Sequence, residues 1–135
     1  MTISVEIRRA RVGNVEAIYK LVNFYARRGK LLKRSKGNIR KDIRNFFVAL
    51  RDEQVVGCAC LAIYSRKMAE VISLAVLPSE SGKGIGKLLV DRCVAKCRKR
   101  RVLELMAITS QEKFFKDLGF DYVLPGERKA LFVKP

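Results

Sequence analysis

Residues 78–89, with the sequence PSESGKGIGKLL, combine residue types that suit the binding of a phosphate group. Three glycines lie between an apolar, strand-like segment and the first turn of an expected helix. Free backbone N–H groups and the positive dipole end at a helix start attract a pyrophosphate, and glycines let it approach the main chain. Lys83 and Lys87 add positive charge. The stretch therefore predicts a phosphate-bearing ligand at the start of this helix.

Other glycine-rich loops place their residues differently. A P-loop ends in Gly-Lys-Ser/Thr, whereas Gly86-Lys87 is followed by Leu88. A dinucleotide-binding fold has its loop after the first strand and an acidic residue about 20 positions further on. Neither pattern matches this chain. A tight turn at Gly84 and Gly86 without a ligand stays open as an alternative.

The hydrophobic pattern predicts the elements that must position this loop. The expected strands are residues 5–11, 46–50, 54–64, 69–76, 102–108, 120–123 and 129–133, and the expected helices lie at 15–25, 39–43, 87–100 and after 109. Three consecutive strands between residues 46 and 76 are expected to form an antiparallel meander. The pattern predicts an α/β domain built on a mixed sheet with flanking helices.

Individual residues indicate where these elements begin or change. Asn14 is expected to cap the first helix, and Thr109 with Glu112 three positions later has the spacing of a capping box. Gly57 is expected to mark a β-bulge.

Length and hydropathy limit the architecture. With 135 residues, 49% of them hydrophobic, the chain is expected to form a single domain over residues 1–135. Its apolar runs are far shorter than the roughly 20 residues of a membrane span, and residues 1–10 carry charges where a signal peptide is apolar. We expect a soluble, cytoplasmic protein without a membrane partner.

The net charge is strongly positive, because 29 Lys and Arg face 13 Asp and Glu, giving +16. Such a surplus attracts polyanions, so nucleic acid has to be considered. However, the basic residues are spread along the chain, and no stacking aromatics are interleaved with them. The sequence therefore favours a solvated basic surface, or a field that gathers an anionic cofactor, over a nucleic-acid partner.

The cysteines fall in two pairs, and the chain contains no histidine. Cys58 and Cys60 share one face of a strand, and Cys93 and Cys97 share one face of a helix. Neither spacing is the short Cys-x-x-Cys typical of zinc sites or redox motifs. We expect buried, reduced thiols and no metal site.

Several segments together resemble the acetyl-coenzyme A motif of the GNAT N-acetyltransferases. They are residues 74–76 (LAV), Pro78, residues 82–86 (GKGIG), residues 88–89 (LL) and residues 114–120 (FFKDLGF). More narrowly, the chain resembles the short N-acetylglutamate synthases, which acetylate the α-amine of glutamate in arginine biosynthesis. That likeness rests on residues 25–32 (YARRGKLL), 34–35 (RS), 56–58 (VGC), 69–70 (AE) and 73–76 (SLAV).

The resemblance implies a GNAT-like, mixed and mostly antiparallel sheet flanked by helices, with acetyl-CoA as cosubstrate. The positions expected to contact it are Leu74, Ala75, Val76, Ser81, Gly82, Lys83, Gly84, Ile85, Gly86, Lys87 and Phe115. The family usually has Arg or Gln where this chain has Ser81, so Lys83 or Lys87 is expected to supply that phosphate contact. Some amino-acid acetyltransferases have an arginine near Thr109 for the substrate carboxylate, where this chain has Ser110 and Gln111.

The acceptor side is predicted from fewer residues. Glu70 is the candidate general base, acting through a water molecule, and the alternative is a surface glutamate paired with a nearby Lys or Arg. Arg34 is the candidate for gripping an acceptor carboxylate through two parallel hydrogen bonds, and a merely solvated arginine is its alternative. Cys58 is expected to border the acceptor pocket while remaining a core residue. No general acid is assigned, although Tyr64 and Tyr122 are available.

Together these residues predict transfer of an acetyl group from acetyl-CoA to a primary amine, in particular the α-amine of an amino acid such as L-glutamate. Two alternatives stay open. The acceptor could be another small amine or a protein N-terminus, or the chain could be a basic nucleic-acid-binding module that keeps a vestigial acetyltransferase fold. A homodimer is one option for its assembly.

Overall fold

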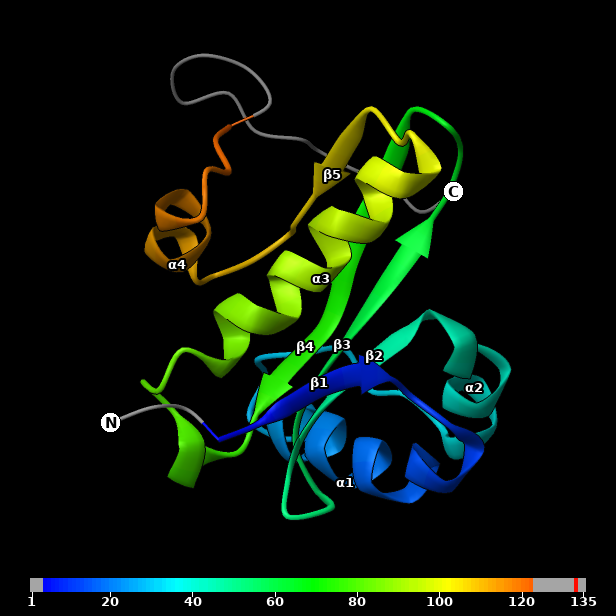
Figure 1. The fold of residues 1–135 in the computed structure, drawn as a ribbon, viewed down its shortest axis with the longest axis vertical. Helices are drawn as coiled ribbons and strands as arrows, with labels where there is room; N and C mark the ends of the chain where they lie inside the picture. The colour runs from blue at the N-terminus through cyan, green and yellow to red at the C-terminus, as the bar shows by residue number, and fades with distance from the viewer. Residues whose placement is uncertain (1–3, 123–132, 134–135) are drawn as a thin grey trace.

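Five strands of the described chain form one sheet in the order β1-β2-β3-β4-β5 (Figure 1). The structure is a computed structural model that describes residues 4–122 and residue 133. The strands are β1 (Glu6–Arg9), β2 (Phe46–Arg51), β3 (Gln54–Ile63), β4 (Met68–Val76) and β5 (Glu104–Met106). The α-helices are α1 (Val15–Ala26), α2 (Lys36–Lys41), α3 (Ile85–Arg100) and α4 (Glu112–Asp117), and short 3-10 turns lie at Val12–Asn14, Ile43–Asn45 and Pro78–Glu80.

The sheet is mixed and mostly antiparallel. Neighbouring strands from β1 to β4 run antiparallel, whereas β5 pairs with β4 in parallel after the crossover through α3. In the meander β2-β3-β4, a two-residue turn joins β2 to β3. Its residues Asp52 and Glu53 both have positive φ, 50° and 67°, which is the conformation that fits the twist of the two strands. The predicted fold class and the antiparallel meander are confirmed.

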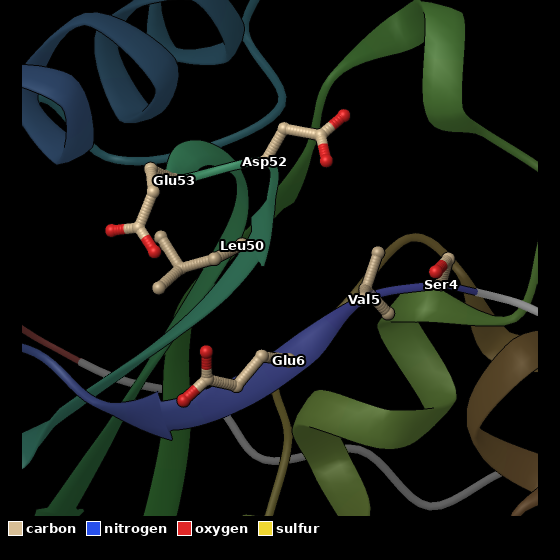
Figure 2. A pocket seen from close by; sticks show the side chains of 6 residues that line it. All are labelled: Ser4, Val5, Glu6, Leu50, Asp52 and Glu53. Carbon is tan, nitrogen blue, oxygen red and sulfur yellow. The ribbon is translucent and has the colours of Figure 1, made fainter.

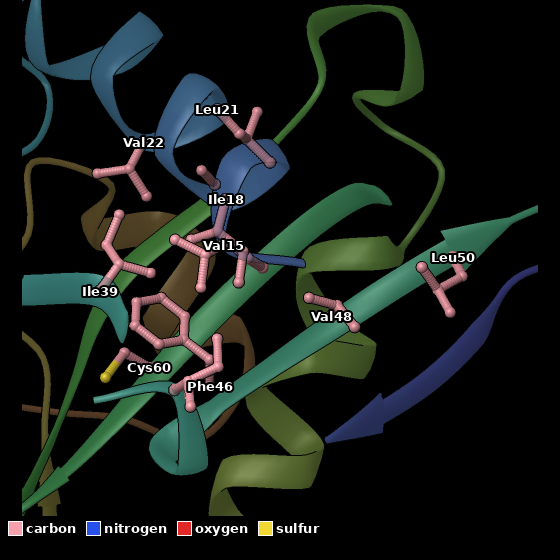
Figure 3. Packing of buried hydrophobic residues seen from close by; sticks show 12 residues of the cluster. Val15, Ile18, Leu21, Val22, Ile39, Phe46, Val48, Leu50 and Cys60 are labelled. Atoms are coloured by element: carbon pink, nitrogen blue, oxygen red, sulfur yellow. The ribbon is translucent and has the colours of Figure 1, made fainter. Parts of the chain in front are cut away.

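The core has two layers, one on each face of the sheet. Because side chains along a strand alternate between faces, Phe46, Val48 and Leu50 pack under α1 and α2 (Figure 3), whereas Phe47 and Ala49 pack toward α3. On α1 the buried apolar positions follow the helical period and are Val15, Ile18, Leu21 and Val22. Figure 1 shows α1 and α2 on one side of the sheet and α3 on the other.

Two irregularities interrupt the ladder of the central strands. In β3, Val56 is an extra residue between the pairs Ala49–Gly57 and Leu50–Val55, so the expected bulge lies beside Gly57. In β4, two residues, Ser73 and Leu74, fit where β3 has only one. Ser73 has φ 53°, which an L-residue adopts rarely. The second bulge reorients β4 just before the glycine-rich loop.

Some local predictions are wrong. Thr109 and Glu112 form no capping box, because α4 starts only at Glu112 and the Thr109 hydroxyl accepts from the Gln111 N–H at 2.8 Å instead. Asn14 occupies the N-cap position of α1, but its side chain accepts from the Arg11 N–H and not from the helix. Of the expected strand 120–123, residues 120–122 are irregular and residue 123 lies outside the described residues, as does most of the expected strand 129–133.

All four cysteines are buried and free, as predicted. Burial raises the pKa of the Cys58 and Cys93 thiols to about 12 and that of Cys60 to about 11, so these groups stay protonated at neutral pH. Within the described residues, no helix is both long and apolar enough to cross a membrane.

Gly57 is packed too tightly for a side chain. A Cβ there would meet Leu89 Cδ1 at 3.1 Å, Ile85 Cγ2 at 3.2 Å and the Ala75 carbonyl at 3.3 Å. We expect Gly57→Ala to lower the free energy of unfolding by about 1–3 kcal/mol through overpacking. Gly37→Ala in α2, whose Cβ would meet nothing within 4 Å, is the matched control and should raise it by up to about 1 kcal/mol. Urea unfolding of both variants tests this; equal stability of the two would contradict it.

Candidate active site

The glycine-rich loop joins the end of β4 to α3. It begins with the 3-10 turn Pro78–Glu80, and two of its glycines, Gly82 and Gly84, have φ of 76° and 84°. Such positive values favour glycine, because a Cβ there clashes with the backbone. The first helical hydrogen bond of α3 runs from the Leu88 N–H to the Gly84 carbonyl, so the N–H groups of residues 85–87 precede it and point out of the helix end.

Aromatic residues of α4 close over this helix start. A Cβ on Gly86 would lie 3.2 Å from Phe114 Cζ, so the missing side chain lets the Phe114 ring settle on the first turn of α3. Phe115 is buried instead and makes edge-on contacts with Phe114 and Phe120 at centroid distances of 5.0 and 5.1 Å. In this structure Phe114, rather than the predicted Phe115, is the aromatic residue that borders the loop.

The two lysines of the loop form ion pairs with nearby carboxylates. Lys83 Nζ lies 3.2 Å from Glu80, and Lys87 Nζ lies 3.0 Å from Asp91. Glu80 in turn accepts two hydrogen bonds of 3.0 Å from the Arg51 guanidinium, which ties the loop to the end of β2. These bonds, chiefly those from Arg51, hold the pKa of Glu80 below its usual value. Both lysines are exposed, so each can leave its carboxylate partner and pair with a bound anion instead.

The edge of β4 next to the loop is open. β5 pairs with β4 only as far as Glu70, opposite Met106, and no described strand pairs with β4 beyond that point on this side. The Leu77 N–H bonds to the Val56 carbonyl of β3 at 2.9 Å, so by strand alternation the backbone groups of Val76 point away from β3. An open strand edge of this kind can pair with an extended, amide-bearing ligand.

Tyr25 of α1 reaches this open edge. Its hydroxyl donates to the Val76 carbonyl at 2.5 Å. From the sequence, Tyr25 is a helix-face residue in the segment 25–32 that carries the resemblance, without a predicted contact. Only the packing of α1 against the end of β4 brings Tyr25 and Val76 together. It is the clearest addition that the structure makes to the predicted site.

Within the described residues, the hydrogen-bond partner of Glu70 is a tyrosine, and no lysine or arginine pairs with it. The Tyr64 hydroxyl donates to Glu70 Oε1 at 2.5 Å. This hydrogen bond, followed by partial burial, raises the pKa of Tyr64 to about 12. At neutral pH the phenol is therefore a neutral donor that holds the Glu70 side chain in place.

Arg34 lies buried at the bulge of β4. Its Nε donates to Asn38 at 2.6 Å, Nη1 to the Ser73 hydroxyl at 3.2 Å and Nη2 to Asp42 at 2.5 Å. A guanidinium has five N–H donors. Three of them bond to oxygens of described side chains, and the Cys60 thiol lies close enough to interact with Arg34 as well. The Cys58 thiol donates to the Ser73 carbonyl at 3.4 Å.

The predicted residues therefore gather along β4. Arg34, Cys58 and Ser73 meet at its bulge, Glu70 lies just before the bulge, and the loop of residues 81–87 follows the end of the strand. Leu74, Ala75 and Val76 connect the two groups. The structure thus brings the cofactor and acceptor predictions to one strand.

Two surface depressions of about 410 Å³ each lie elsewhere. The first is bordered by the carboxylates of Glu6, Asp52 and Glu53, which would repel an anionic cofactor (Figure 2). The second is lined by α4 residues and Tyr122. Neither is lined by a residue predicted to bind the cofactor or the acceptor, although Tyr122, one of the tyrosines available as a general acid, borders the second.

Comparison with known proteins decides the family. The sequence model of the acetyltransferase (GNAT) family matches residues 14–120, which include β4, the loop, α3 and α4. The chain belongs to the GNAT family. As a GNAT enzyme it is an N-acetyltransferase with acetyl-CoA as cosubstrate.

Relatives within the GNAT family support this assignment. An uncharacterized N-acetyltransferase of Chlorobaculum tepidum is 43% identical over 114 residues, covering 84% of this chain and 74% of that protein. An amino-acid acetyltransferase of Mycobacterium tuberculosis is 34% identical over 118 residues, covering 84% and 67%.

Solved structures agree on the GNAT fold. A Mycobacterium tuberculosis structure in complex with CoA and NLQ has a TM-score of 0.84 at 30% identity, covering 93% of this chain and 76% of that one. N-acetylglutamate synthase from Neisseria gonorrhoeae, complexed with coenzyme A and N-acetyl-glutamate, has a TM-score of 0.81 at 27% identity. This match covers 87% of this chain but only 28% of that longer one.

The loop of this GNAT protein fits the phosphates of acetyl-CoA. Gly82 leaves open space where a Cβ would stand, and α3 has neither a side-chain cap nor an acidic residue in its first turn. Anions bind readily at a helix start of this kind.

The contact between Tyr64 and Glu70 can be tested by titration. We expect Glu70→Gln to lower the pKa of Tyr64 from about 12 toward its ordinary value near 10, because the negative acceptor is lost. Absorbance of the phenolate measures the shift, and Tyr64→Phe assigns it to this tyrosine. A Tyr64 ionisation that stays the same in Glu70→Gln would show that the two groups do not interact.

Proposed function

We propose that this enzyme acetylates the α-amine of an amino acid whose side chain carries a carboxylate, such as L-glutamate. The observation that carries the proposal is the buried guanidinium of Arg34 at the β4 bulge, which has more N–H donors than the three that bond to oxygens of the described residues. Two donors on adjacent nitrogens suffice for one carboxylate. Relatives named amino-acid acetyltransferase and N-acetylglutamate synthase support the same acceptor class.

On the cofactor side, each part of the site has its own task. The N–H groups at the start of α3, with Lys83 and Lys87, bind the phosphates. The open edge of β4 around Leu74 and Val76 pairs with the amide-bearing arm. When bound, acetyl-CoA supplies the thioester whose acetyl carbon is attacked and whose sulfur leaves with the bonding electrons.

On the acceptor side, the amine must lose a proton before it can attack. Glu70 takes that proton, directly or through a water molecule, while Tyr64 fixes its orientation. The new N–C bond then forms as the C–S bond breaks, and no covalent bond to the protein is needed. Arg34 and Cys58 border the acceptor, so the chain's contribution is mainly orientation and proton removal.

Gly84 tests the cofactor assignment. An alanine at φ 84° costs about 1–2 kcal/mol, and the loop escapes this strain by leaving its conformation. We therefore expect Gly84→Ala to bind acetyl-CoA roughly tenfold more weakly by calorimetry. Gly37→Ala, in a helix remote from the loop, should bind as the wild type does. Unchanged affinity in Gly84→Ala would remove the loop from the cofactor site.

Arg34 tests the acceptor assignment. We expect Arg34→Lys to raise the KM for L-glutamate by roughly tenfold or more, because an ammonium cannot replace the bidentate grip. Because Arg34 also holds the bulge of β4, affinity for acetyl-CoA and activity with an amine that lacks carboxylates are measured alongside: the KM for glutamate should change more than either of them. Arg40→Lys, exposed on α2, is the control. An unchanged KM for glutamate would exclude Arg34 from acceptor binding.

The acceptor panel for this experiment includes small amines and peptides with free N-termini. Transfer to those alone would replace the amino-acid proposal with the alternative acceptor class. A role in arginine biosynthesis, a cytoplasmic location and a homodimer remain predictions from the sequence.

A further inference from the structure

Part of the positive charge that the active site does not use lies along one flank of α3. Arg92, Lys96 and Arg100 follow one another at intervals of four residues, so they lie along one side of the helix. Arg9 of β1 joins them, because it lies opposite Phe47 in the sheet and so faces the same side as Phe47, toward α3. We call these four residues the basic stripe.

Local contacts fix the stripe in place. Arg92 Nη1 donates to the Ile7 carbonyl at 2.7 Å, and its guanidinium lies 5.2 Å from the centre of the Phe47 ring. Lys96 Nζ lies 5.7 Å from the same ring. Burial, followed by the nearby cations Arg9 and Arg100, lowers the pKa of Lys96.

Acidic residues do not neutralise the stripe. In the part of the chain that the structure describes, none of its four members forms an ion pair. The acid nearest in sequence on α3, Asp91, is taken by Lys87. Holding like charges together without counter-ions is unfavourable, and an external anion relieves it.

The stripe is separate from the active site described above. It lies on the α3 side of the sheet, whereas Arg34 and its partners lie on the α1 and α2 side. It also begins about two turns after the helix start that faces the cofactor phosphates. Acetyl transfer therefore does not account for it.

We propose that the basic stripe binds the phosphate backbone of duplex nucleic acid. Cations at a regular spacing of about 6 Å along a helix suit a regular array of phosphates. Phe47 is buried beneath the stripe, so it offers no ring for base stacking, which single-stranded binding uses. A protein partner would need apolar or aromatic anchors, whereas this surface is made of cations.

This inference departs from the sequence-based expectation of no nucleic-acid partner. In the sequence, Arg9 is far from α3, and the basic residues are spread along the chain, densest at residues 8–11, 27–36 and 96–101. Only the packing of β1 beside α3 assembles them on one surface. Binding of this kind contacts phosphates alone, so it carries no sequence preference.

Salt-dependent binding to labelled duplexes tests the proposal in the full chain. The matched variants are Arg9→Gln/Lys96→Gln/Arg100→Gln and, on the opposite layer, Arg27→Gln/Arg40→Gln/Lys41→Gln, which remove the same charge. Fluorescence anisotropy between roughly 50 and 200 mM salt gives the slope of log K against log salt. Duplex DNA, duplex RNA and poly-glutamate are tested in parallel.

We expect the stripe variant to lose about 0.9 from the slope for each phosphate contact removed, about 2.7 for three, while the opposite-layer variant changes little. Both variants should still bind acetyl-CoA as the wild type does, which shows that they fold. The proposal is overturned if the two variants weaken binding equally, if the slope is unchanged, or if poly-glutamate binds as well as the duplexes. A preference for RNA or for DNA identifies the natural source of the phosphates.

Discussion

The rest of the structure depends on the point where β4 stops pairing with β5. Up to Glu70 the strand is bonded on both sides, and beyond it β3 is the only described strand that pairs with β4. The bulge at Ser73 and Leu74 follows immediately, so the strand turns just where its free edge begins. A strand bonded on both edges has no backbone groups to offer a ligand. The interruption of the sheet is therefore what makes β4 usable as a binding surface.

A buried polar network holds the bulge in its unusual conformation. Arg34 reaches Ser73 from one side while Asn38 and Asp42 hold its guanidinium, and Asn23 bonds to the Arg34 backbone carbonyl at 2.9 Å. A buried guanidinium without these partners would be strongly destabilising. The residues that hold the bulge are thus the same residues that present the remaining Arg34 donors. Structural support and acceptor recognition are carried by one set of contacts.

The sequence predicted well what depends on periodicity and composition. Alternation in β2 and β3 and the helical period of α1 and α3 reflect which faces are buried, so the sheet and its flanking helices followed from pattern alone. It failed where a local group had a choice of partners: Thr109 and Asn14 both bond to nearby backbone N–H groups outside the helices they precede. It also could not find Tyr25 or the pairing of Glu70 with Tyr64, because those contacts depend on tertiary packing. For the same reason, Arg34 was identified by residue type but its buried surroundings were not.

The two ends of α3 differ in charge and capping, and this difference explains why the ligand-binding loop lies at the N-terminal end. At the C-terminal end, Arg98, Lys99 and Arg100 complement the negative end of the helix dipole. At the N-terminal end, Gly84 has no side chain to cap the helix, and the first turn contains no acid. Relative to a capping side chain, glycine at this position leaves a helix less stable by roughly a few tenths of a kcal/mol. The phosphates of acetyl-CoA can supply the missing acceptors, so the helix is completed by its ligand, and the glycines that weaken the free protein are the residues that admit it.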